Sequence, residues 1–349
     1  MTLKTSDFDY HLPTELIAQD PLEKRESCRM LHLNKTTQTF EDKHFFDVLD
    51  LLNKDDILVL NDTKVYPARV IAHRQSGASV EVFLLNPIDN SNHWEALTKN
   101  AKRVKEGEIL EVAPDFQIKL IEKRQANSEN EIPKYIVELI FENEDVYQVL
   151  DKYGSIPLPP YINREIKEND KDNYQTVFAR NIGSAAAPTA GLHFSKELLE
   201  KIKQKGVHIA YVTLNVGLGT FMPVKVENLA EHTMHHESFS ISKETADLIN
   251  NKKGSVVAVG TTALRCLEAT YRKHGKIIET KDKTDIFIYP PQEVKSIDKL
   301  ITNFHLPKST LIMLISAFAG KDFVFSAYKH AVEEKYRFFS YCDCMFIYK

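Results

Sequence analysis

The stretch VVAVGTTALRCLEATYRKHG, Val256 to Gly275, decides the fold class of this chain. Its first four residues form a short apolar run that predicts a buried strand, and Gly260-Thr261-Thr262 predicts a turn. Ala263 to His274 then predicts a helix that Gly275 ends. A strand followed directly by a helix is the repeating unit of an α/β domain with a parallel sheet.

The same alternation continues on both sides of this stretch. Ser195 is a suitable N-cap for a helix over Lys196 to Lys205, which Gly206 ends before the apolar run VHIAYVTLNV. DILVL at Asp56 to Leu60, DIFIY at Asp285 to Tyr289 and KLIT at Lys299 to Thr302 predict further strands, and an apolar helix is expected from Thr310 to Phe318. We therefore predict a large α/β domain with a mostly parallel sheet that is covered on both faces.

The region from Ala68 to Phe141 follows a different pattern. Six short alternating or β-branched runs, broken by turn residues, succeed one another there without helices between them: ARVIAH, SVEVFLL, HWEALT, ILEVA, FQIKLIE and YIVELIF. Such a series predicts a small antiparallel sheet that closes into a barrel or a sandwich. We expect a barrel over residues 68–154, inserted into a large domain formed by residues 1–67 and 155–349.

The bulk composition indicates a globular chain without a membrane segment. It has 349 residues, of which 43% are hydrophobic and 27% charged, and a net charge of −4. Its longest apolar run, Leu311 to Ala319, is shorter than a membrane span needs, and no signal peptide is recognisable. We expect a cytoplasmic protein with reduced thiols, no membrane contact and no obligate protein partner.

The sequence contains no recognised metal-ligand pattern. The spacing of His232, His235, His236 and Glu237 differs from the H-E-x-x-H helix of zinc enzymes. Cys342-Asp343-Cys344 lacks the two-residue gap and the second ligand pair of a zinc site. The prediction is therefore that the chain has no metal site.

Four polar or glycine-containing motifs follow predicted strands of the large domain. In an open parallel sheet, ligands bind beyond the carboxyl ends of the strands, so a common pocket is expected there. The motifs are Asn61-Asp62-Thr63-Lys64, Gly217-Leu218-Gly219-Thr220, Gly260-Thr261-Thr262 and Asn303 to Ser309. The first turn of the helix at Gly260 favours an anion, and Arg265 either adds a bidentate contact or lies on the surface.

Six segments together resemble one family. They are NIGSAAAPTAGLHF at Asn181 to Phe194, LNDTKVYPAR at Leu60 to Arg69, TLNVGLGTF at Thr213 to Phe221, AVGTTALR at Ala258 to Arg265, TDIFIYP at Thr284 to Pro290 and LITNFHLPKSTL at Leu300 to Leu311. The chain resembles the S-adenosylmethionine:tRNA ribosyltransferase-isomerases of queuosine biosynthesis from FDYHLPTELIAQDPLEKR near its start to YRFFSY near its end. Asn215, Pro291, Cys342 and Cys344 depart from the pattern of that family.

The resemblance implies transfer and isomerisation of the ribosyl part of S-adenosylmethionine onto 7-aminomethyl-7-deazaguanine at the tRNA wobble position. The product is epoxyqueuosine, and adenine and methionine leave, so S-adenosylmethionine is a consumed substrate and no other cofactor is expected. We assign proton transfer to Asp285 and His305. Asp285 begins an apolar strand, so it is expected to be buried, and burial would raise its pKa. Arg265 is expected to bind a charged group of the substrate. The expected substrate-binding residues are Asn61, Asp62, Thr63, Lys64, Thr189, Gly191, His193, Gly219, Thr220, Thr261, Thr262 and Lys308.

The negative net charge requires a local basic patch for tRNA, because Lys and Arg supply most of the affinity for phosphates. Such a patch is expected at Lys99, Lys102, Arg103 and Lys105; the alternative is solvated surface charge. Two other functions are compatible with the residues. One is a non-catalytic RNA-binding barrel, for which Trp94 beside Lys99 is the only sign, and the other is a nucleoside hydrolase with the same pocket.

Overall fold

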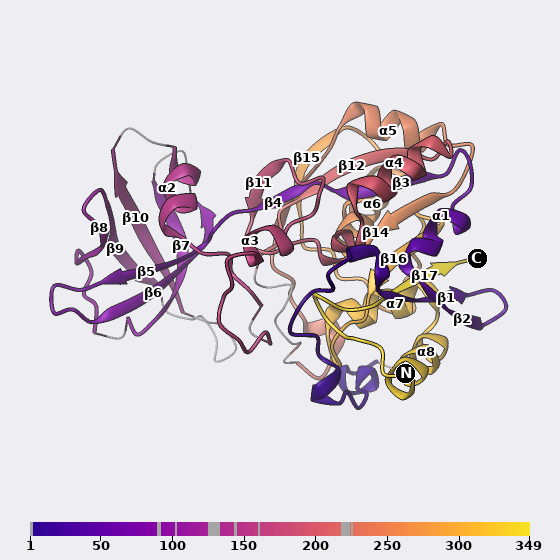
Figure 1. Cartoon of the computed structure of the whole chain (residues 1–349), viewed down its shortest axis with the longest axis horizontal. Coiled ribbons are helices and arrows are strands. Elements are labelled where there is room, and N and C mark those ends of the chain that lie inside the picture. The colour runs from indigo at the N-terminus through magenta and orange to yellow at the C-terminus, as the bar shows by residue number, and fades with distance from the viewer. Residues whose placement is uncertain are drawn as a thin grey trace.

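The chain forms two parts that lie side by side along the longest axis of the molecule (Figure 1). The computed structural model describes residues 3–88, 92–101, 103–124, 133–142, 145–159, 161–217, 224 and 226–349. The larger part is built around a nine-stranded sheet, and the smaller part is a closed barrel. The predicted fold class, a mixed α/β domain with an inserted antiparallel barrel, is confirmed.

The large sheet has parallel strands at its centre. Its strand order is β15 (Thr280–Thr284), β13 (Glu237–Ile241), β12 (His208–Leu214), β3 (Ile57–Asn61), β14 (Val256–Val259), β16 (Lys299–Asn303), β17 (Cys344–Tyr348), β1 (Arg29–Asn34) and β2 (Thr39–His44). β12, β3, β14 and β16 are parallel neighbours, as are β17 and β1. The other four pairings are antiparallel. Two helices, not one, separate β16 from β17, so the chain re-enters the sheet in the opposite direction.

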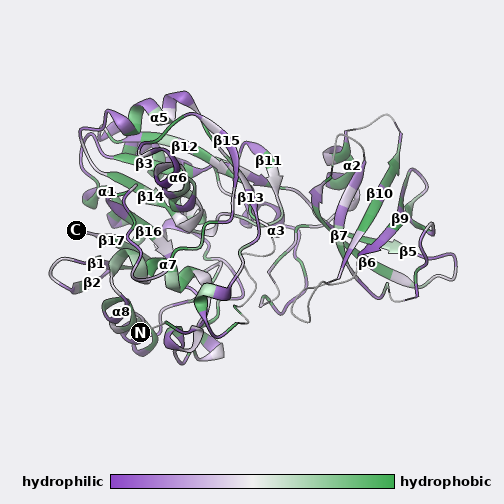
Figure 2. Ribbon diagram, turned by 180° about the vertical axis from the view of Figure 1, so that it is seen from behind, coloured by the Kyte–Doolittle hydropathy of each residue, from purple (hydrophilic) through white to green (hydrophobic). Residues whose placement is uncertain are grey.

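Helices cover both faces of this sheet, and the alternation within β3 shows why. Ile57 and Val59 face a core shared with α6 (Gly260–His274), α5 (Lys243–Asn250), α7 (Thr310–Ala319) and α8 (Lys321–Glu333). Leu58 and Leu60 face the other core, shared with α1 (Val48–Leu51) and α4 (Lys196–Gln204). Because successive side chains of a strand point to opposite faces, this strand, apolar from Ile57 to Leu60, is buried on both sides. Figure 2 shows the apolar colouring of these central strands.

Short elements complete the large part. A two-stranded parallel sheet joins β4 (Thr63–Val65) to β11 (Asn181–Ser184), and α3 (Asp170–Asn173) lies between the two parts of the molecule. The 3₁₀ helices are η1 (Thr5–Phe8), η2 (Thr14–Leu16), η3 (Arg25–Ser27), η4 (Phe45–Asp47), η5 (Thr189–His193) and η7 (Leu229–Glu231). In the described part of the chain, no single helix has the length and apolar character to cross a membrane; the bent pair α7 and α8 passes that test only when taken together.

The six strands predicted between Ala68 and Phe141 are all present. They are β5 (Arg69–His73), β6 (Ser79–Pro87), β7 (His93–Lys99), β8 (Ile109–Ala113), β9 (Phe116–Arg124) and β10 (Lys134–Phe141), closed in the order β10-β7-β6-β5-β8-β9. Their alternate residues fill a separate core around Trp94 and Phe116. The helix α2 (Val146–Tyr153), capped by Asp145, packs Val149 and Leu150 against that core.

The two ends of the inserted barrel meet at one bridge. The backbone N–H of Arg69 donates to the carbonyl of Ser155 at 3.2 Å, and Ser155 N–H donates back to Arg69 at 2.8 Å. The predicted boundaries, residues 68 and 154, therefore lie next to each other where the chain leaves and re-enters the large part.

Three details of the large part differ from the sequence prediction. The run Asp285 to Tyr289 is not a strand; β15 ends at Thr284, where pairing with β13 stops. Helix α6 begins at Gly260, three residues earlier than expected, because the predicted turn is its first turn. β1, β2, β4, β11, β13, β15, β17, α1, α3, α5 and α8 were not predicted.

Candidate active site

A pocket opens beyond the carboxyl ends of β14 and β16. About 790 Å³ of empty space, open solvent included, lies within and above it. Its walls come from six segments that are separated in the sequence. The lining residues are Tyr161, Ala187 to Ala190, Val216, Gly260 to Thr262, Thr302 to Pro307, Ser309, Leu311, Phe339 and Ser340.

The expected convergence of strand ends on one edge follows from the parallel order of β12, β3, β14 and β16. Of the predicted site residues, Thr189, Thr261, Thr262 and His305 line the pocket. The Thr262 hydroxyl oxygen is buried and has no hydrogen-bond partner among the described residues. A buried hydroxyl without a partner is costly, so this atom is a natural contact for a polar ligand group.

His305 is buried in the wall of the pocket. Its Nε2 and the Thr302 hydroxyl are 2.9 Å apart, and its backbone N–H donates to the Tyr328 hydroxyl at 2.8 Å. Burial lowers the pKa of His305 from its ordinary value to about 3. The imidazole is therefore neutral near pH 7, with one ring nitrogen able to donate and the other able to accept.

Arg265 lies in the core beneath the first turn of α6, so the alternative that places it on the surface is wrong. Its side chain is 2% exposed, and Nη1 donates to Glu237 Oε2 on β13. The Arg265 Nε and Nη2 atoms are buried without a partner in the described part of the chain. Arg265 is not among the lining residues, so its direct effect is to hold Glu237 and the base of α6 together.

Asn61, Asp62 and Thr63 do not line the pocket in the described structure. Asn61 exchanges hydrogen bonds with the backbone of Leu214, at 3.1 and 3.0 Å. Asp62 accepts from Arg180 at 2.9 Å and from Thr213 at 2.7 Å. These contacts join β3, β11 and β12, so the first motif is a structural network at the strand ends.

Four further residues are placed differently from the prediction. Lys64 lies on β4 beside β11, and Lys308 pairs with Asp9 at 2.8 Å; neither lines the pocket. Gly191 packs closely, since a Cβ there would lie 2.8 Å from the Phe178 ring and 2.9 Å from the Thr176 methyl group. Asp285 is 58% exposed, 3.8 Å from His236, so its expected burial is wrong because no strand forms there. Gly219 and Thr220 lie outside the described residues.

His193 lies one layer behind the pocket. Its Nε2 is 2.8 Å from Asn303 Oδ1, and Asn303 donates to the Thr189 hydroxyl at 3.1 Å. On its other side, Nδ1 is 3.2 Å from Cys28 Sγ. His193 therefore supports two lining residues without being one itself.

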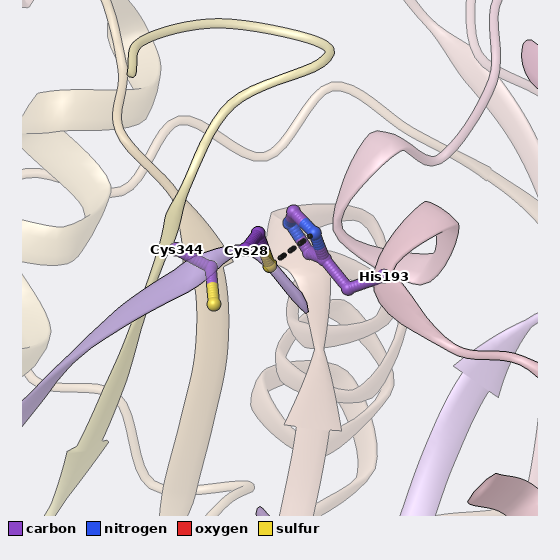
Figure 3. A group of neighbouring side chains, drawn as sticks. All are labelled: Cys28, His193 and Cys344. Carbon is purple, nitrogen blue, oxygen red and sulfur yellow. Dashed lines mark hydrogen bonds between the residues drawn. The ribbon is translucent and has the colours of Figure 1, made fainter. Parts of the chain in front are cut away.

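The sulfur atoms of two cysteines lie close to the His193 ring, a grouping that the sequence reasoning missed (Figure 3). Cys28, His193 and Cys344 are all buried, and one ligand-type atom of each lies within 4.8 Å of the others. Burial raises the pKa of the Cys28 thiol, but its contacts with Cys344 and His193 lower it to about 6. We call Cys28, His193 and Cys344 the Cys–His cluster.

The expected tRNA patch lies on the barrel. Lys99, Arg103 and Lys105 are exposed, and Lys102 falls outside the described residues. Lys99 is 3.6 Å from Glu81. Trp94 is 2% exposed and packs against Tyr66 and Tyr147, so it offers no stacking surface to RNA.

The sequence reasoning also missed part of the pocket wall. The Tyr161 and Phe339 rings pack in a tilted arrangement with their centroids 4.2 Å apart, and the Tyr161 hydroxyl forms a hydrogen bond with Ser340. Both Tyr161 and Ser340 lie in segments without regular secondary structure, far apart in sequence, so no periodic signal pairs them.

Comparison with known proteins gives consistent matches over the whole chain. A family model described as queuosine biosynthesis protein matches residues 5–347. An S-adenosylmethionine:tRNA ribosyltransferase-isomerase from Sulfurihydrogenibium sp. (strain YO3AOP1) is 56% identical over 350 residues, covering 99% of this chain and 100% of the relative. The crystal structure of an S-adenosylmethionine tRNA ribosyltransferase from Thermotoga maritima matches with a TM-score of 0.56 at 37% identity, over 98% of this chain and 100% of that one.

Proposed function

The chain belongs to the family of queuosine biosynthesis proteins, and on that premise we propose that it is an S-adenosylmethionine:tRNA ribosyltransferase-isomerase. It transfers the ribosyl part of S-adenosylmethionine to 7-aminomethyl-7-deazaguanine at the tRNA wobble position. The products are epoxyqueuosine-tRNA, adenine and methionine. S-adenosylmethionine is consumed, and no further cofactor is proposed for the reaction.

One observation carries the proposal to the level of the site. Much of the pocket wall comes from Thr189–Ala190, Gly260–Thr262 and Thr302–Pro307, which belong to the segments on which the family resemblance rests. Segments shared by a family for packing alone would have no reason to meet around one cavity. Their meeting supports a common small-molecule site.

The chemistry needs a base, a proton donor and contacts for both ends of the donor molecule. The sulfonium makes the hydrogens on the ribose 5′ carbon acidic, so a base can remove one of them before the isomerisation. The neutral His305, with its ring beside the Thr302 hydroxyl, is placed for hydrogen bonding and proton transfer in the pocket wall. Adenine leaves more easily when a donor protonates or hydrogen-bonds it.

The first turn of α6 is suited to the methionine carboxylate. Gly260 and Thr261 line the pocket at the start of a 15-residue helix, whose first N–H groups and dipole favour an anion. The Thr262 hydroxyl adds an unused donor there. Arg265 lies beneath that turn, where its charge is paired with Glu237 and the pair holds β13 against α6.

The tRNA substrate must present one base out of the stack, because the reacting base has to enter the pocket. An anticodon loop allows this at lower cost than a duplex does. The exposed basic residues of the barrel are proposed to contact the tRNA backbone. A cytoplasmic location, which fits a tRNA substrate, remains a prediction.

The decisive experiment is mass analysis of anticodon nucleosides after incubation with S-adenosylmethionine and precursor tRNA. We expect conversion to epoxyqueuosine, with adenine released in equal amount. Adenine release without tRNA would favour the nucleoside hydrolase. Tight tRNA binding without conversion, by a folded protein supplied with S-adenosylmethionine, would favour a non-catalytic RNA-binding protein.

A further inference from the structure

Three elements deliver sulfur and nitrogen donors to one buried place behind the pocket. Cys28 follows η3, His193 ends η5, and Cys344 begins β17 (Figure 3). Cys28 is 2% exposed, His193 4% and Cys344 0%. We propose that the Cys–His cluster binds a zinc ion, through the Cys28 and Cys344 thiolates and the Nδ1 atom of His193.

The spacing of the donors suits such an ion. Zinc binds thiolate sulfur at about 2.3 Å and imidazole nitrogen at about 2.0–2.1 Å, which places two tetrahedral sulfur ligands about 3.8 Å apart. Cys28 Sγ is 3.2 Å from His193 Nδ1, and all three donor atoms lie within 4.8 Å of one another. Side-chain adjustments of less than about 1 Å therefore suffice to surround an ion.

The orientation of the imidazole is fixed from its other side. The Asn303 amide nitrogen donates to the Thr189 hydroxyl at 3.1 Å and to the Phe339 carbonyl at 3.2 Å. Its oxygen must then be the acceptor that faces His193 Nε2 at 2.8 Å, so Nε2 carries a proton. In the neutral ring the lone pair is left on Nδ1, directed at Cys28. A zinc-binding histidine characteristically donates its second N–H to an oxygen in this way.

The backbone around the two cysteines is held by Asp343. Its Oδ1 accepts from the Arg29 N–H at 2.8 Å, and its Oδ2 accepts from the Arg337 N–H at 2.8 Å. β1 and β17 are parallel neighbours, with Met30 opposite Cys344. The two thiols are therefore presented by adjacent strand starts whose separation is fixed before an ion binds.

The net charge of the site and the number of its ligands also bear on zinc binding. Two thiolates and one zinc ion are neutral together, which lowers the cost of burying them. Zinc prefers four ligands in structural sites; Cys342 is buried two residues before Cys344, but it lies outside the group of donors within 4.8 Å and would have to move to become the fourth. The ion is structural, since it holds His193 behind the pocket wall, and His193 in turn supports the lining residues Asn303 and Thr189.

Elemental analysis of the full-length protein tests this assignment. Protein purified with a phosphine reductant and without chelator should carry about one zinc ion per chain. Cys344→Ala, which removes only a sulfur atom, should lose that zinc. Cys266→Ala is the matched control, because Cys266 is equally buried but lies on α6, outside the cluster. Its zinc content should equal that of the wild type.

A second readout does not depend on a folded variant. Wild-type protein loaded with Co²⁺ should show the intense visible absorption of a tetrahedral thiolate site, and added zinc should abolish it. Wild-type protein that binds neither metal, equal zinc in wild type and Cys344→Ala, or a Cys28–Cys344 disulfide in reduced preparations would each overturn the proposal.

Discussion

His305 is the lining residue proposed for hydrogen bonding and proton transfer, although its lowered pKa makes the neutral ring a weak base; its replacement gives the first prediction. His305→Asn keeps a hydrogen-bonding group of similar size beside Thr302 but removes the titratable ring. Turnover should fall roughly a hundredfold or more, as for a positioned acid–base group. Steady-state rates of epoxyqueuosine formation measure this, with circular dichroism as the control for folding. Near-normal turnover in a folded variant would exclude His305 from the reaction.

His305 should also make the fold sensitive to acid. In the folded state burial lowers its pKa to about 3, whereas in the unfolded chain it titrates near its ordinary value of 6.5. Below pH 6.5 the unfolded chain binds the additional proton, so the free energy of unfolding falls as pH falls from 6.5 toward 3. Tyr10 and Tyr328, which bond to its backbone, have raised pKa values and stay neutral throughout.

The measurement is urea unfolding at pH 7.5 and pH 5 for wild type and His305→Gln. A protonation difference of one proton changes the free energy of unfolding by about 1.4 kcal/mol per pH unit. Between pH 7.5 and pH 5, the free energy of unfolding of the wild type should therefore fall by about 2 kcal/mol more than that of the variant. Groups common to both proteins cancel in the comparison. An equal loss in the two proteins would show that His305 takes up its proton in the native state.

The buried pair of Arg265 and Glu237 gives a third prediction, on stability. Both side chains are almost inaccessible, at 2% and 4%. Arg265→Met takes the guanidinium away from a buried carboxylate, so the free energy of unfolding should fall by about 3–5 kcal/mol. Adding Glu237→Leu should recover much of this loss in chemical denaturation. A double variant as unstable as the single one would show that the ion pair is not the cause.

Residue roles were only partly predictable, and the reason is geometric. Thr189, Thr261, Thr262 and His305 follow strands or begin helices, so the sheet alone places them at the pocket. Asp285 was expected to be buried because apolar residues follow it, but alternation does not reveal whether a partner strand exists. Cys28 and Cys344 meet only because β1 and β17 pair across the whole length of the chain.

At the scale of elements, the junction of barrel and large part gives a fourth prediction. Gly154 ends α2, and a Cβ there would collide with the Pro67 carbonyl and lie 2.7 Å from the Leu150 carbonyl. Neither backbone group yields easily, so Gly154→Ala should lower the free energy of unfolding by about 1–3 kcal/mol. Gly217→Ala is the control, because a Cβ at Gly217 meets no atom of the described residues within 4 Å. Equal stability of the two variants would contradict this.

The barrel strands were predictable because apolar and polar residues alternate along each of them. Each strand also forms an antiparallel pair with a strand that is next to it in the sequence. The large sheet was harder. Its central strands contain apolar runs that are visible in the sequence, whereas β2 is largely exposed and β15 consists of polar residues only. Such edge strands are specified by their neighbours more than by their own residues, which is why they were not predicted.

At the scale of the whole molecule, charge and shape must be considered together. The chain has a net charge of −4, so tRNA cannot be attracted by its total charge. The barrel projects from the large part and carries Lys99, Arg103 and Lys105 on its surface. A basic patch on a projecting part can reach tRNA phosphates while the reacting base occupies a pocket elsewhere.

The fifth prediction follows from this separation. Each phosphate contact releases counterions, so tRNA affinity should fall steeply with salt. Arg103→Gln with Lys105→Gln should flatten the slope of log affinity against log salt by roughly one to two units, with S-adenosylmethionine binding unchanged. Lys196→Gln with Lys201→Gln is the control, because these exposed lysines lie on α4 of the large part. If the barrel variant keeps the wild-type slope, the patch is solvated surface, and the tRNA lies along another face of the protein.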